Sequence, residues 1–78
     1  MRKIKLIWDF RGLHSLETAK HHEIHLKDFL IAQNFENTLT GFEPINELHT
    51  IAFLVVEEPQ MILVRDLLKP HRAQVFED

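Results

Sequence analysis

The sequence predicts a single α+β domain with the element order β-α-β-β-α-β, in which two helical patterns alternate with four strand patterns. Its length of 78 residues is that of one domain, spanning 1–78. The hydrophobic fraction of 45% is normal for a folded chain. There is no cysteine, so the sequence excludes disulfides and thiolate metal ligands, and a reducing compartment suits it.

The first half of the chain predicts a strand followed by a long helix. Apolar and polar side chains alternate over 3–10, as in a half-buried strand. The helix is predicted over 15–33, with Ser15 as its N-cap and Asn34 in the left-handed conformation after its end. One helix face carries the predicted core stripe, which consists of Ala19, Leu26 and Leu30, flanked by Leu16 and Phe29.

Two further strands are predicted in the middle of the chain. The segment 36–45 is the weaker strand, and Pro44 assigns it to a sheet edge because proline cannot donate to the ladder. The segment 49–57 is apolar on both faces between Ile51 and Val56. Such a strand is expected to lie at the centre of a sheet that is covered on both sides.

The last third of the chain predicts a short helix and a final strand. Glu58 and Pro59 begin the helix, with Pro59 as its first helical residue, and Pro70 marks its end. The final strand is predicted over 71–78. The expected buried stripe of the helix consists of Met61, Val64, Leu67 and Leu68.

This element order is the split βαβ pattern of the ferredoxin-like fold, with a four-stranded antiparallel sheet and both helices on one face. The other sheet face is open in this fold. Here it would hold alternate residues of 51–56, a set too apolar for water. We therefore expect a homodimer that closes sheet against sheet through the open face.

The segment "LTGFEPINELHTIAFLVVEEPQMILVRDLLKPHRAQVF" (39–76) resembles the dimeric α+β barrel superfamily, which includes the YCII-like proteins. It has that family's succession of a strand entering a turn, an apolar strand ending in acid, a short helix and a return strand after a proline. The family's glycine–proline pair before the hairpin is absent, and "GFEP" (41–44) stands in its place. The family contains small enzymes, degradation accessory proteins and binding proteins, so the resemblance implies a fold and a dimer but no single function.

Histidines are concentrated in "ETAKHHEIHLKDF" (17–29). Helical geometry puts His21 and His25 on one polar face and turns His22 toward the border of the core stripe. Histidines at i and i+4 can chelate one ion, so His21 and His25 form a candidate transition-metal site that needs help from His14 or a dimer mate. The alternative is a solvated helix face with acid–histidine pairs.

Chain direction collects polar residues from several connections at one end of the predicted fold, where binding residues are often found. They are Asp9, Arg11, His14, Glu47, His49, His71 and Arg72. The candidate catalytic residues are Asp9, His14, His49 and His71, because an acid beside a neutral histidine is the usual acid–base partnership near neutral pH. The candidate ligand-binding residues are Trp8, Arg11, His21 and Arg72. Trp8 fits a pocket lining or the plain core.

Three functions remain open from the sequence. The first is a dimeric domain that binds a small anionic or aromatic ligand at the His/Arg-rich end. The second is a small enzyme that uses a His–Asp pair in isomerase-like or lyase-like chemistry, and the third is metal binding. The net charge of −3 argues against nucleic-acid binding. The N-terminal segment does not read as a signal peptide and no apolar run approaches the ~20 residues of a membrane span, so a soluble, cytoplasmic domain is expected.

Overall fold

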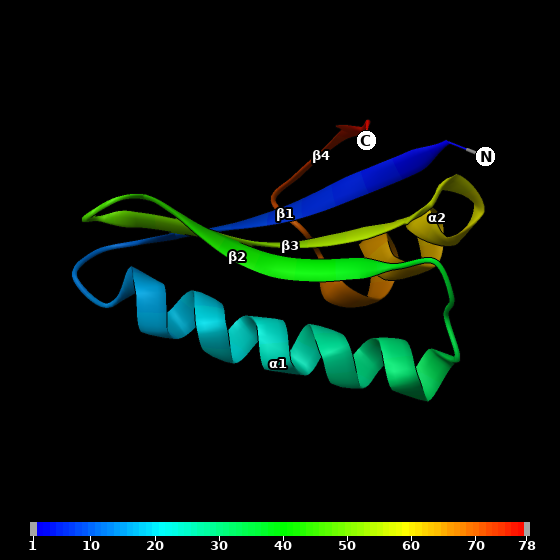
Figure 1. Cartoon of the computed structure of the whole chain (residues 1–78), viewed down its shortest axis with the longest axis horizontal. Helices are drawn as coiled ribbons and strands as arrows, with labels where there is room; N and C mark the ends of the chain where they lie inside the picture. The colour runs from blue at the N-terminus through cyan, green and yellow to red at the C-terminus, as the bar shows by residue number, and fades with distance from the viewer. Residues whose placement is uncertain (1, 78) are drawn as a thin grey trace.

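A computed structural model describes residues 2–77 and shows a four-stranded antiparallel sheet with two helices (Figure 1). The strand order is β2-β3-β1-β4, so β1 and β3 are central and β2 and β4 are edges. This confirms the predicted α+β class and the βαββαβ topology of the ferredoxin-like fold. The elements are β1 (Lys3–Arg11), α1 (Ser15–Gln33), β2 (Leu39–Asn46), β3 (His49–Glu57), α2 (Glu58–Leu68) and β4 (Arg72–Phe76).

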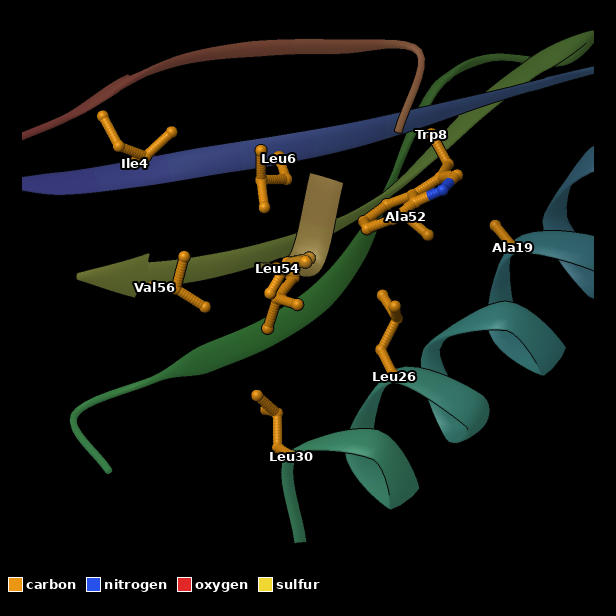
Figure 2. Close-up of a cluster of buried hydrophobic side chains, with 10 residues drawn as sticks. Ile4, Leu6, Trp8, Ala19, Leu26, Leu30, Ala52, Leu54 and Val56 are labelled. Atoms are coloured by element: carbon orange, nitrogen blue, oxygen red, sulfur yellow. The ribbon is translucent and has the colours of Figure 1, made fainter. Parts of the chain in front are cut away.

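One face of the sheet forms the hydrophobic core with both helices. Because side chains alternate along a strand, every second residue of β1 and β3 points toward α1 (Figure 2). Val64 brings α2 onto the same face. The buried cluster consists of Ile4, Leu6, Trp8, Ala19, Leu26, Leu30, Ala52, Leu54, Val56 and Val64. The predicted stripe of α1 is thus confirmed.

The N-terminus of α1 differs from the prediction. The N-cap is His14, and Ser15 is the first residue of the helix, buried against the sheet. Its hydroxyl lies 3.1 Å from the hydroxyl of Thr50 on β3, so it satisfies a buried partner instead of a helical amide. At the other end Asn34 has a φ of 56°, which confirms the left-handed residue after the helix.

The remaining boundaries differ from the predictions by a few residues. The strand β2 begins at Leu39, three residues after the predicted start, because Asn37 is left-handed with a φ of 57° and cannot extend a strand. Glu57 is the N-cap of α2, so Pro59 is its second helical residue and not its first. The last strand, predicted over 71–78, is limited to Arg72–Phe76, and position 78 lies outside the described residues.

The buried stripe of α2 is narrower than predicted. Val64 is fully buried, and Met61 and Leu68 are partly buried against the core. Leu67 is exposed, so its assignment to the stripe is wrong. Leu67 lies about 60° from Val64 around the helix axis, on the opposite flank from Leu68, and that flank meets no element of the core.

Three apolar residues on the open face of the sheet are buried within the single chain. Ile7, Ile51 and Val55 point to this face but are only 2%, 5% and 1% exposed. The Phe53 ring lies against Gly41 of the neighbouring strand, and the Lys5 ammonium lies 4.4 Å from the centroid of that ring. The sheet-to-sheet dimer therefore stays a prediction. Within residues 2–77, neither helix is long and apolar enough to cross a membrane.

Candidate functional site

Asp9 is the centre of a polar cluster on the open face of the sheet. One carboxylate oxygen, Oδ1, lies 2.7 Å from Nε2 of His49. The guanidinium of Arg72 donates from Nε to Oδ2 at 2.9 Å and from Nη2 to Oδ1 at 3.1 Å. Asp9 and His49 are mostly buried, whereas about half of the Arg72 side chain is exposed.

The strand register explains why these three residues meet. Asp9 pairs with Ile51 on β3. Its neighbour Trp8 points into the core, so the Asp9 side chain points to the opposite, open face of the sheet. His49 begins β3 on one side of β1, and Arg72 begins β4 on the other side. Each of them is therefore a diagonal neighbour of Asp9, within reach of a long or aromatic side chain.

The contacts fix the protonation of the cluster. The hydrogen bond from Arg72 is the largest cause that holds the pKa of Asp9 down, to about 2, with a smaller contribution from His49 and against the opposing effect of burial. The same bond raises the pKa of Arg72. An ionised carboxylate can only accept, so His49 donates its Nε2–H and its Nδ1 is left for another partner.

His71 joins the same cluster through hydrogen bonds with the backbone of β1. Its Nδ1 accepts the amide N–H of Asp9 at 2.8 Å, and its own amide donates to the carbonyl oxygen of Ile7 at 2.9 Å. A ring nitrogen accepts only when it carries no proton, so in this arrangement the proton of His71 is on Nε2. The ring is exposed, and this N–H is free to meet a ligand.

Acid is expected to weaken the folded state through Asp9. Its pKa falls from 3.8 to about 2 on folding, so the stabilisation is complete above the unfolded value and is lost as the pH falls through the folded one. Urea unfolding of the wild type and Asp9→Asn should therefore differ most above about pH 5 and converge toward about pH 2. A difference that is constant over this range would contradict the ion pair.

The structure brings together four of the predicted site residues and separates the others. Asp9, His49, His71 and Arg72 are joined by the contacts above. Trp8 is buried in the core, and its indole N–H donates to the carbonyl oxygen of Leu68 at 3.0 Å, so it does not line an open site. The others are exposed and make no side-chain hydrogen bond with the cluster within residues 2–77; these are Arg11, His14, His21, His25 and Glu47.

Within residues 2–77 the structure places no third ligand beside the predicted metal site of His21 and His25. Among residues 2–77 no group of three or more histidine, aspartate or glutamate side chains is placed to hold an ion. His21 and His25 lie on the exposed side of α1, as helical geometry predicts. Metal binding by this pair alone, or with a second chain, stays a prediction.

His22, unlike the exposed His21 and His25, lies at the border of the core. Its ring centroid lies 4.8 Å from that of Trp8 and 5.4 Å from that of Phe10, and its buried Nε2 has no hydrogen-bond partner. Burial is the main cause that lowers the pKa of His22, followed by the charges of His25 and His71. The double histidine at 21–22 therefore contains one solvated and one packed ring.

Mild acid should destabilise the chain through His22. The pKa of His22 is about 6.5 in the unfolded chain and lower in the folded state, so protonation opposes folding. The stability that is present above pH 6.5 is lost as the pH falls below this value. His22→Phe should remove part of the loss of unfolding free energy between about pH 7 and about pH 5. His21→Phe is the matched control on the exposed face and should leave the pH profile unchanged.

A groove of about 530 Å³ lies away from the cluster, at the C-terminal end of α1. The sequence did not indicate this groove, because the residues that line it form no recognisable binding motif. They are Lys27, Leu30, Ile31, Asn34, Phe35, Glu36 and Thr38.

No protein-family model matches this chain, and neither the curated proteins nor the solved structures contain a match to it. The ferredoxin-like topology is shown by the strand order and the connections of the sheet. The finer resemblance to YCII-like proteins rests on the sequence pattern of residues 39–76 alone.

Proposed function

We propose that the domain binds a small carboxylate- or phosphate-bearing ligand at the cluster of Asp9, His49, His71 and Arg72. The observation that carries the proposal is the two-point bond between Arg72 and Asp9 beside the ring of His71. Asp9 uses two of the five guanidinium N–H groups and holds the plane of the guanidinium, so the others can meet an anion. The Nε2–H of His71 is a further donor.

Titration with inorganic phosphate and benzoate, followed by NMR, tests this proposal. The ring signals of His71 should shift on addition of at least one anion in the wild type. Arg72→Gln should raise the dissociation constant at least about tenfold, which corresponds to about 1.4 kcal/mol of binding free energy. Arg65→Gln is the matched control, since Arg65 is an exposed arginine on α2 whose partner is the neighbouring Asp66. Equal binding by both variants would contradict the proposal.

A second function is supported by the bond between His49 and Asp9. The ionised carboxylate orients the ring, and Nδ1 is the nitrogen that could take a proton from a substrate. This is the chemistry of an isomerase or lyase that removes a proton next to a carbonyl group. No serine or cysteine nucleophile is part of the cluster, which argues for proton transfer without a covalent intermediate.

A screen of small carbonyl acids tests this second function. Activity should be lost in His49→Gln and Asp9→Asn and retained in His14→Gln, because His14 lies at the same end of the sheet and its described hydrogen bond uses its backbone carbonyl oxygen. Activity that survives in the His49 and Asp9 variants would remove the dyad from the mechanism.

A further inference from the structure

The outer side of β4 is an unpaired sheet edge with apolar side chains beside it. β4 pairs with β1 on one side only and ends the sheet in the order β2-β3-β1-β4 (Figure 1). Val75, on the helix side of this strand, is 46% exposed. Leu63 and Leu67 on α2 are also exposed. An exposed edge with apolar side chains is a template for pairing with another strand.

The hydrogen bonds of β1 show which backbone groups of β4 point outward. The carbonyl of Ile7 and the amide of Asp9 both bond to His71, so the odd-numbered residues of β1 direct their backbone groups toward β4. Their register partners on β4 are Arg72, Gln74 and Phe76, which point back. The backbone groups of Ala73 and Val75 therefore point away from the sheet and are free to pair.

We infer that β4 pairs with β4 of a second copy of this chain, antiparallel, around a two-fold axis at Gln74. In this register Ala73 is opposite the partner's Val75, so the outward amides and carbonyls of both residues bond in pairs. Arg72 is opposite the partner's Phe76, where a guanidinium can stack on a ring. The two sheets become one continuous eight-stranded sheet with all four helices on one side.

The side-chain pattern favours a second copy over an unrelated strand. The two-fold axis makes the strand its own complement, because each copy supplies Ala73 to one apolar pair and Val75 to the other, with an Arg72–Phe76 pair beyond each. Shifting the register by two residues places Val75 opposite His71, or Ala73 opposite Glu77. Either shift puts an apolar side chain opposite a polar one, so the strand specifies a single symmetric register.

The edge pairing rests on β4 alone and does not depend on ligand binding or on acid–base chemistry at Asp9. It uses a different surface from a dimer closed through the open sheet face, so the two dimers are distinguishable.

A single introduced cysteine tests the register, since the natural chain has none. Two copies of residue 74 at the axis form a pair without direct hydrogen bonds, with Cα atoms about 4.5 Å apart. A disulfide spans about 4.4–6.8 Å between Cα atoms. Gln74→Cys should therefore convert to a disulfide-linked dimer under mild oxidation, whereas Leu39→Cys, on the open face of the other edge strand, should stay reduced. Linking through Leu39→Cys without Gln74→Cys would overturn the inference.

Light scattering with a proline variant tests the backbone pairing. The wild type should have twice the 9.3 kDa mass of one chain, and so should Ala73→Val, which keeps the amide. Ala73→Pro removes an outward N–H that the chain's own ladder does not use, so it should be monomeric with an unchanged circular dichroism spectrum. A monomeric wild type, or a dimeric folded Ala73→Pro, would overturn the inference. If Ala73→Pro does not fold, the Gln74→Cys result decides.

Discussion

Replacing Leu54 with alanine is expected to lower the free energy of unfolding by about 2–5 kcal/mol. Leu54 is fully buried on the central strand β3, opposite Leu6 on β1, and belongs to the core between sheet and helices. Removing its branched end leaves a cavity that the two rigid central strands cannot fill. A domain of this size has little stability in reserve, so urea unfolding followed by circular dichroism should show a large fraction unfolded without denaturant.

Leu13→Ala is the matched control for this substitution. Leu13 is highly exposed in the connection between β1 and α1, so its loss should change the unfolding free energy by no more than about 0.5 kcal/mol. Equal losses for the two leucine variants would show that the core is not centred on β3.

Replacing Gly41 with alanine should cost about 1–3 kcal/mol, although alanine usually stabilises a strand relative to glycine. A Cβ atom at this position would lie 2.5 Å from Cζ of the Phe53 ring. The ring would have to swing away from β2 and lose its contact with the Lys5 ammonium. Thermal unfolding should show the loss as a lower midpoint temperature.

A double-mutant cycle identifies the ring as the cause. In a Phe53→Leu background the added methyl group meets a smaller side chain, so Gly41→Ala should become neutral or stabilising. If Gly41→Ala costs the same in both backgrounds, the strain lies in the backbone of β2 and not in the ring.

The sequence predicted the fold because its central elements carried clear local signals. The alternation in β1, the stripe of α1 and the apolar run in β3 were each sufficient to assign an element, and chain order then fixed the topology. The N-cap of α1 was misassigned because a side chain there acts across elements. Ser15 is a good N-cap by type, but Thr50, far away in the sequence, holds its hydroxyl.

The candidate site was predicted as a region and not as a set of contacts. Chain direction brought Asp9, His49, His71 and Arg72 to one end of the fold, and the structure joins them. The same reasoning included His14, which is exposed at the helix start, because direction alone cannot give strand register. Register decides which side chains are diagonal neighbours, and no local pattern encodes it.

The position of β1 also has a consequence for synthesis on the ribosome. This strand emerges before the other three, yet it lies between β3 and β4, which both come from the second half of the chain. Until β3 emerges, the apolar side chains of β1 have no strand to pair with and only α1 to pack against. A nascent chain that stops before Arg72 also lacks the cation that neutralises Asp9. The residues of the core have therefore all emerged once α2 is made, whereas the polar cluster is completed only when β4 reaches β1.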